Sequence, residues 1–117
     1  MRAVPVDLRY LQEITGGDRL FFRELMDDFV EMGAELFRRM AECASTGDFE
    51  ELKTTAHALK GGSFSVGSEA LGDMAAEIEL CCLGDNKDSV VTLIDKSRTE
   101  FDRICKWWAH GSEDYAA

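Results

Sequence analysis

The feature that most constrains the fold is the recurrence of apolar residues at intervals of three and four along most of the chain. In the longest such stretch, from Asp18 to about Ser45, the predicted inward positions are Phe22, Leu25, Phe29, Met32, Leu36, Met40 and Cys43. This spacing places them on one side of an α-helix, because an α-helix has about 3.6 residues per turn. No stretch alternates apolar and polar residues as a half-buried strand would. The pattern predicts an all-α protein.

Capping and turn residues divide the rest of the chain into further helices. Asp7 is expected to cap a short helix from Leu8 to about Thr15, which Gly16-Gly17 ends. Gly47 ends the long helix, and Asp48 is a suitable N-cap for the next one. The predicted inward residues of this third helix are Phe49, Leu52, Ala56, Leu59, Ser63 and Val66.

Two more helices follow. Gly67 breaks the third helix and Ser68 is expected to cap the fourth, whose inward residues are Leu71, Met74 or Ala75, and Ile78. After a turn at residues 83–86, the last helix is predicted to direct inward Val90, Ile94, Phe101, Ile104 and Trp108. Four amphipathic helices with short connections predict an antiparallel up-down four-helix bundle, with the short N-terminal helix packed on it. We expect a single domain over residues 1–117, with its core at about 18–109 and a flexible tail at 110–117.

The net charge and the cysteines limit the classes of partner and the compartment that we expect for this protein. The 117 residues carry a net charge of -10, which argues against nucleic acid and against an anionic membrane surface as partners. No apolar run approaches the roughly 20 residues of a membrane span, and the N-terminus lacks the apolar core of a signal peptide. The four cysteines all fall in apolar helical stretches: Cys43, Cys81, Cys82 and Cys105. We interpret them as reduced core thiols of a cytoplasmic monomer whose partner is a protein.

The exposed face of the third helix carries an unusual set of groups. Because Ala56 is expected to face the core, His57 is rotated by about 100° toward solvent. The face is predicted to carry Lys53, His57, Lys60, Gly61 and Phe64. Two consecutive glycines, Gly61 and Gly62, weaken a helix by roughly 1 kcal/mol each relative to alanine. The glycines and the exposed aromatic ring together indicate a docking surface for a partner.

Phosphoryl transfer is the chemistry that fits this face. A neutral imidazole is a good nucleophile near neutral pH, and Lys60 one turn away from His57 can offset the charge of a bound phosphoryl group. Gly61 removes the side chain that would obstruct an incoming active site. The chain has no phosphate-binding Gly-x-x-x-x-Gly-Lys-Ser/Thr loop and is too short for a kinase domain. We therefore expect a carrier without its own nucleotide site, metal or cofactor, whose partner supplies the catalysis.

The segment from His57 to Ser63, followed by Gly67, Leu71 and Ile78-Glu79, resembles the histidine-containing phosphotransfer (HPt) domains, and the resemblance runs from about Leu20 to Trp108. It implies a four-helix bundle whose exposed histidine exchanges a phosphoryl group with the aspartyl phosphate of a receiver domain. His57 matches the phosphorylated histidine, Lys60 the charge partner and Gly61 the clearance position. The partners implied are a response-regulator receiver domain, which would hold Mg²⁺, and a histidine kinase.

Gly62 departs from the Ser or Ala of many family members and resembles the Lys-Gly-Gly of chemotaxis-type histidine kinases. In that subgroup a Glu on the following helix orients the imidazole, and Glu79 stands at the corresponding position. The resemblance thus predicts that Glu79 accepts a hydrogen bond from Nδ1–H of His57 and leaves Nε2 free to react.

Two alternatives remain open at this point. The chain could be a docking bundle that binds a receiver or other signalling protein through the His57/Phe64 face without accepting phosphate. It could also be the phosphoacceptor domain of a chemotaxis-like kinase, phosphorylated by an ATP-binding domain. His110 is interpreted as a solvated helix-end residue, and the acidic pairs Asp27-Asp28 and Glu50-Glu51 as solvated helix faces.

Overall fold

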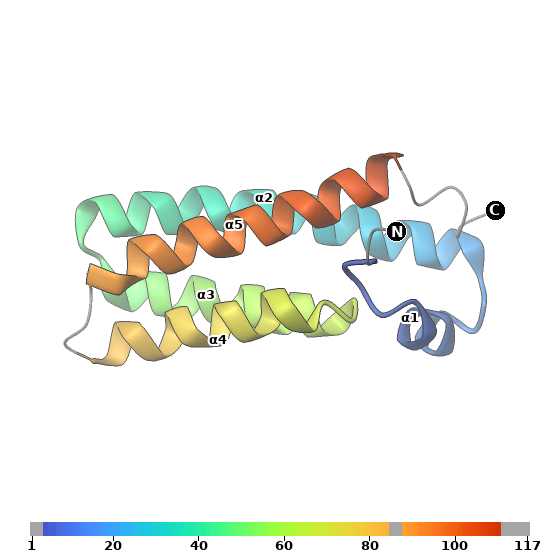
Figure 1. Ribbon diagram of the computed structural model, residues 1–117, viewed down its shortest axis with the longest axis horizontal. Coiled ribbons are helices and arrows are strands. Elements are labelled where there is room, and N and C mark those ends of the chain that lie inside the picture. Colours follow the sequence, from blue (N-terminus) through green and yellow to red (C-terminus); the bar gives the residue numbers. More distant parts are fainter. Residues whose placement is uncertain (1–3, 85–87, 111–117) are drawn as a thin grey trace.

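The helices of the computed structural model, which describes residues 4–84 and 88–110, form an antiparallel bundle. In chain order they are α1 (Leu8–Thr15), α2 (Arg19–Thr46), α3 (Phe49–Ser65), α4 (Glu69–Leu83) and α5 (Asp88–His110). Figure 1 shows α2 to α5 running in alternating directions, with α1 lying beside the N-terminal half of α2. The predicted all-α bundle with a short N-terminal helix is confirmed. Of the expected tail at 110–117, His110 is the last residue of α5 and the rest lies outside the described residues. Of the expected turn at 83–86, Leu83 is the last residue of α4, and residues 85 and 86 lie outside the described residues.

The helices begin where the aspartate caps predict. Each capping carboxylate accepts a hydrogen bond from the backbone N–H three residues later, at 3.0–3.1 Å, in the pairs Asp7 with Tyr10, Asp18 with Phe21 and Asp48 with Glu51. Ser68 occupies the N-cap of α4, but its side chain makes no capping bond. Its buried Oγ finds no hydrogen-bond partner among the described residues. The predicted side-chain cap of α4 is therefore wrong, although the helix begins at the predicted place.

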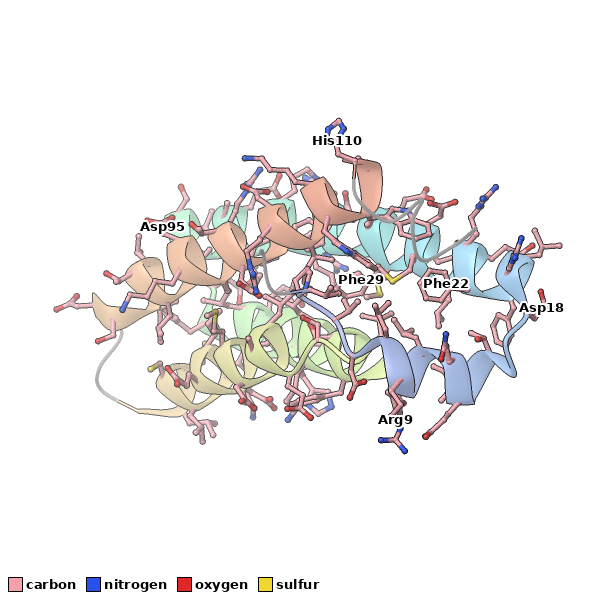
Figure 2. All side chains as sticks on the ribbon, turned by 45° about the vertical axis from the view of Figure 1, so that its right-hand side comes forward. Arg9, Asp18, Phe22, Phe29, Asp95 and His110 are labelled. Carbon is pink, nitrogen blue, oxygen red and sulfur yellow. The ribbon has the colours of Figure 1, made fainter. Side chains whose placement is uncertain are left out.

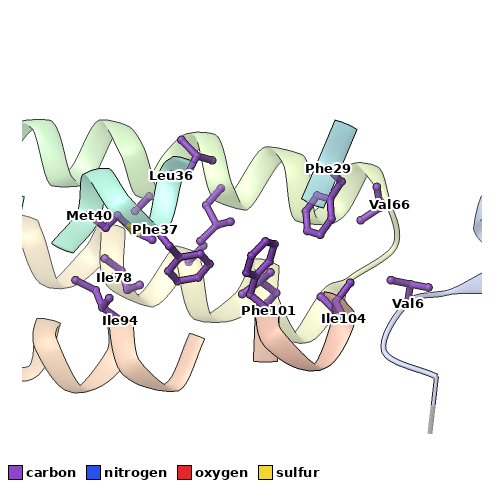
Figure 3. Packing of buried hydrophobic residues seen from close by; sticks show 14 of the residues in the cluster. Val6, Phe29, Leu36, Phe37, Met40, Val66, Ile78, Ile94, Phe101 and Ile104 are labelled. Carbon is purple, nitrogen blue, oxygen red and sulfur yellow. The ribbon is translucent and has the colours of Figure 1, made fainter. Parts of the chain in front are cut away.

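The core lies along the axis of the bundle, where α3 contacts α2 and α4, and α5 contacts α4 and α2. Buried side chains from all these helices meet there (Figure 3). The ring of Phe101 on α5 lies between two rings of α2, with centroid distances of 5.9 Å to Phe29 and 5.2 Å to Phe37. This shared core holds α2, α3 and α4 in fixed register, which is what positions residues on their outer faces.

The buried stripe of α2 differs from the predicted one in its middle. Gly33 is buried because the Phe101 ring lies against it, and a Cβ at position 33 would lie 2.2 Å from Cε1 of that ring. The contact with α5 therefore lies over Gly33, and the neighbouring Met32 is 37% exposed at the edge of the contact between α2 and α3. Leu25 is only half-buried, whereas Met26 and Phe37 are buried positions that the sequence pattern missed.

The C-terminal half of α5 packs on the first half of α2. Trp108 is half-buried, its ring 5.6 Å from that of Phe22, and its Nε1–H donates a 2.7 Å hydrogen bond to the Asp27 carboxylate. Trp108 is thus an edge residue rather than a core residue, because its indole N–H needs a polar partner. Asp27, expected to be simply solvated, supplies that partner. Phe49, also predicted to face inward, is half-buried as well.

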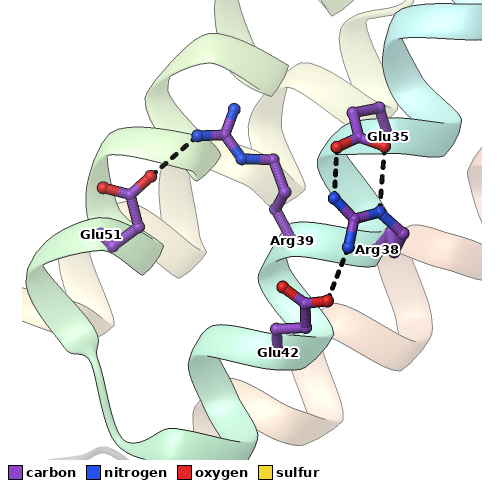
Figure 4. Close-up of polar contacts among 5 residues, drawn as sticks. All are labelled: Glu35, Arg38, Arg39, Glu42 and Glu51. Carbon is purple, nitrogen blue, oxygen red and sulfur yellow. Dashed lines mark hydrogen bonds and ion pairs between the residues drawn. The ribbon is translucent and has the colours of Figure 1, made fainter.

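Polar and charged side chains cover the outside of the bundle, as Figure 2 shows for Arg9, Asp95 and the projecting His110. On α2, Arg38 bonds to both Glu35 and Glu42, and the neighbouring Arg39 crosses to Glu51 of α3 at 3.0 Å (Figure 4). The position of His110 agrees with its interpretation as a solvated residue at a helix end.

The cysteines, all within the described residues, are free thiols. Cys43 is buried as predicted, whereas Cys81, Cys82 and Cys105 are only half-buried. Burial raises the pKa of the Cys43 and Cys105 thiols, which keeps them protonated. None of the helices in residues 4–84 and 88–110 combines the length and the apolar character that a bilayer span requires.

Candidate functional site

The site is centred on His57, which projects from the outer face of α3. The opposite face of α3 is anchored in the core by Leu52, Ala56 and Leu59, all fully buried. One residue past Ala56, the His57 side chain is 66% exposed. The rotation of about 100° per residue explains this position, because a buried residue 56 places residue 57 toward solvent. The imidazole is thus fixed at its base by a rigid helix and open to an approaching partner.

Glu79 of α4 joins the site from 22 positions further along the chain. Its Oε2 lies 3.0 Å from Nδ1 of His57, and its Oε1 lies 2.9 Å from Nζ of Lys60. Ile78 and Ala75 are fully buried, which fixes the rotation of α4 and directs Glu79 toward α3. The side chain of Glu79 is only 17% exposed. One carboxylate therefore engages both functional groups of α3, and the predicted contact with Nδ1 is present.

The electrostatics of this triad keep the carboxylate charged. The ion pair with Lys60 lowers the pKa of Glu79, partial burial opposes this effect, and the hydrogen bond to His57 lowers the pKa further. An ionised carboxylate can only accept hydrogen bonds, so Nδ1 of His57 is assigned as the protonated nitrogen. Nε2 then carries the free lone pair. The arrangement presents an imidazole in the tautomer that reacts through its outer nitrogen.

The two glycines beside the histidine have different reasons to be glycine. A Cβ at Gly61 would meet nothing within 4 Å, so none of the residues that the structure describes requires a small residue there. A Cβ at Gly62 would lie 2.2 Å from the terminal methyl of Met32 on α2. Gly62 therefore faces the Met32 methyl of this chain, and the expectation that both glycines leave room for a partner stays a prediction. At Gly61, by contrast, no described neighbour explains the absence of a side chain.

Phe64 and Lys53 lie on either side of His57 along the helix. Phe64 is 41% exposed, and its ring covers Gly72 of α4 so closely that a Cβ at position 72 would lie 2.6 Å from Cε1. Part of this ring thus serves the packing of α3 on α4, and the rest is available at the surface. Lys53 is half-buried and lines an open hollow together with His57 and Glu79.

The sequence pattern misses two features of the site. The hollow beside His57 has an acidic rim formed by Asp48, Glu50 and Glu51, which the sequence treats as a cap and a solvated face. The pairing of Lys60 with Glu79 is the second feature. The sequence predicts only that Lys60 offsets the charge of a phosphoryl group on His57. Helical spacing could have suggested the rim, since residues 50 and 57 are two turns apart. The Lys60 pair depends on how α4 is placed against α3.

Comparisons with known proteins agree with this geometry. The Hpt domain family matches residues 19–107, which span nearly all of α2 to α5 and include His57. The chain is similar to histidine-containing phosphotransfer protein 2 of Arabidopsis thaliana, with 28% identity over 101 residues, 84% of this chain and 64% of that protein. It thus spans less than two thirds of the length of that relative.

The fold comparison gives the same result. The crystal structure of histidine-containing phosphotransfer protein B from Pseudomonas aeruginosa PAO1 superimposes with a TM-score of 0.88, at 25% identity. The match covers 97% of this chain and 99% of that one. Taken with the family match and the exposed, carboxylate-bound histidine on α3, this shows that the chain belongs to the Hpt domain family, the histidine phosphotransfer domains of phosphorelays.

Proposed function

We propose that this chain carries a phosphoryl group on Nε2 of His57 and exchanges it with the aspartate of a response-regulator receiver domain. The observation that carries the proposal is the exposed imidazole whose Nδ1 is held by Glu79 at 3.0 Å. That bond leaves the outer nitrogen unprotonated and directed to the surface. A histidine kinase is the other partner class that the family suggests for the same residue.

The proposed reaction is a direct transfer of the phosphoryl group between an aspartate and His57. The lone pair of Nε2 attacks the phosphorus of an aspartyl phosphate, an N–P bond forms, and the acyl O–P bond breaks to release the aspartate carboxylate. The ring gains a positive charge while its Nδ1–H proton stays in the hydrogen bond to Glu79. That bond becomes charge-assisted as the N–P bond forms, and it therefore stabilises the product more than the free histidine. The same step in reverse returns the phosphoryl group to a receiver.

The neighbouring residues support the exchange. Lys60 holds the second oxygen of Glu79 at 2.9 Å and so keeps the carboxylate aligned with the ring. Gly61 leaves the surface next to His57 bare, which suits the close approach of a receiver active site. The Mg²⁺ that neutralises the transferred phosphoryl group would be held by the receiver, and its chemistry belongs to that partner. Phe64, with its partly exposed ring, is proposed as a contact for the same partner.

The test is phosphorylation of the full chain by potassium phosphoramidate, a direct donor to imidazoles, and by a phosphorylated receiver domain with Mg²⁺. The wild type is expected to gain an acid-labile phosphohistidine, and His57→Gln is expected to gain none. His110→Gln is the matched control, because His110 is exposed at the far end of α5 and should leave labelling unchanged.

Two outcomes would contradict the proposal. Labelling that persists in His57→Gln would place the phosphoryl group elsewhere. An unlabelled wild type that still binds a receiver, with equal affinity in His57→Gln, would instead support the non-phosphorylated docking bundle.

A further inference from the structure

An open hollow lies beside the His57 ring, formed by the first half of α3 and by Glu79 of α4. Its charged lining residues are Asp48, Glu50, Glu51, Lys53 and Glu79. Lys60 does not line it, because the ammonium of Lys60 is drawn to the Oε1 of Glu79. Among the described residues that line the hollow, Lys53 is thus the one cation, and it faces four carboxylates.

Most of those carboxylates already have partners. Glu79 contacts both Lys60 and His57, Glu51 pairs with Arg39 of α2 at 3.0 Å, and Asp48 accepts the capping bond at the start of α3. Lys53 has no ion pair within 4.0 Å among the described residues. Its ammonium is therefore available for an anion that enters the hollow.

We propose that Lys53 is the ammonium that pairs with the phosphoryl group on His57, whereas Lys60 acts indirectly by holding Glu79 against the imidazole. This assignment rests on the proposed function, since it concerns the phosphorylated form of His57. The sequence resemblance assigns the charge partner of the phosphoryl group to Lys60. In the present assignment that role belongs to Lys53, and Lys60 has the role of positioning Glu79.

The helix geometry brings the two groups together. Lys53 and His57 are four residues apart, so their Cβ atoms are neighbours at roughly 5–6 Å on the helix surface. Side chains of an α-helix lean toward its N-terminus, so the His57 ring covers the turn that begins at Lys53. The phosphoryl group on Nε2 is held away from Glu79, which contacts the opposite ring nitrogen. It would therefore be placed among the carboxylates of the hollow, where only Lys53 supplies an opposite charge.

The experiment is a ³¹P NMR pH titration of the full chain phosphorylated on His57 by potassium phosphoramidate. Removing a nearby ammonium raises the pKa of a phosphoryl group, because the dianion loses a stabilising charge. In Lys53→Ala we expect a rise of about half a pH unit, the effect of one charge roughly 6 Å away in water. Lys53→Arg should restore the wild-type titration. Lys96→Ala, which removes an exposed lysine of α5, should leave it unchanged.

Lys60→Ala separates the two lysines. It should move the phosphoryl titration less than Lys53→Ala does, and it should shift the ¹⁵N signal of the Nδ1–H group, since Glu79 loses its second partner. An unchanged titration in Lys53→Ala with a large change in Lys60→Ala would overturn the assignment of Lys53. If the wild type forms no phosphohistidine, the proposed function itself fails, and this assignment fails with it.

Discussion

At the scale of single residues, the site depends on one carboxylate that serves two cationic or potentially cationic groups. Glu79 is mostly covered, so its interactions with Lys60 and His57 are less screened by water than those of a surface pair. The lysine and the histidine lie one turn apart on α3, and the carboxylate reaches both from α4. This arrangement fixes the tautomer of the imidazole with side chains from α3 and α4.

Glu79→Ala is expected to slow the phosphorylation of His57 by potassium phosphoramidate about tenfold or more, the typical worth of a charge-assisted hydrogen bond. It should also change the pH dependence of stability. The pKa of Glu79 is lowered in the folded protein from the ordinary 4.5. The ionised carboxylate therefore stabilises the folded protein fully above that pH, and this stabilisation is lost as the pH falls below it. The difference in free energy of unfolding between wild type and variant should therefore be constant near neutral pH and shrink at acidic pH.

Denaturant titrations at a series of pH values measure this difference, and Glu77→Ala provides the control. Glu77 is exposed on the same helix. If the two variants behaved alike in both rate and pH dependence, Glu79 would have no positioning role.

At the scale of helices, glycines set three of the interhelical contacts. Gly33 on α2 receives the Phe101 ring of α5, Gly62 on α3 receives the methyl of Met32, and Gly72 on α4 receives the ring of Phe64. The three contacts differ in how easily the neighbouring group can move. Phe101 is a rigid buried ring, whereas Met32 ends in a flexible methyl and the Phe64 ring is partly exposed. Substitution should therefore be most costly at Gly33.

Gly33→Ala is expected to lower the free energy of unfolding by about 1–3 kcal/mol, the usual cost of overpacking a core. The new Cβ would lie 2.2 Å from Cε1 of the Phe101 ring, which is buried in the core. Chemical denaturation measures the loss, and Phe101→Leu in the same chain should recover part of it. Gly61→Ala is the matched control on α3. With nothing within 4 Å of the added Cβ, it should gain about 1 kcal/mol from helix propensity. Equal effects at the two positions would contradict the packing argument.

At the scale of the whole molecule, the N-terminal segment closes one end of the bundle. The backbone N–H of Asp7 donates a 3.0 Å hydrogen bond to the carbonyl oxygen of Gly67, in the turn between α3 and α4. Val6 and Leu11 are buried on either side of this contact in the sequence. Gly67 has a φ of 73°, a left-handed conformation, and a Cβ there would lie 3.0 Å from the Asp7 nitrogen. The turn and the N-terminal segment are therefore coupled through one glycine.

Gly67→Ala is expected to cost more stability than Gly47→Ala, which changes a glycine of nearly the same φ, 76°, with open space around it. The control should lose only about 1–2 kcal/mol from left-handed strain, and Gly67→Ala should lose more through the clash with Asp7. Hydrogen exchange should also show reduced protection of the α1 amides in Gly67→Ala alone. Equal losses, with α1 protection unchanged in both, would show that the segment is not coupled to the turn.

Local chemistry explains how much of this protein can be predicted. The periodicity and the aspartate caps predict the helices because these signals act within a few residues of one another. The periodicity wrongly predicts Met32 as a core residue and misses the buried Gly33. The reason is that a helix that contacts several others can bury more than one row of residues. The placement of His57 toward solvent follows from the burial of Ala56, its neighbour in the sequence. The sequence points to Glu79 only through a family resemblance, since 22 residues separate it from His57.

The sequence by itself determined the helices, their approximate ends and the face of α3 that carries the imidazole, because each depends on spacing along one segment. Only the tertiary structure decided which groups from other helices contact that face. The pairing of Lys60 with Glu79, the contact of Gly62 with Met32 and the acidic hollow that leaves Lys53 available all arise where helices meet. Their relative rotation is set by the buried core, and a contact across that core has no signal in either helix alone.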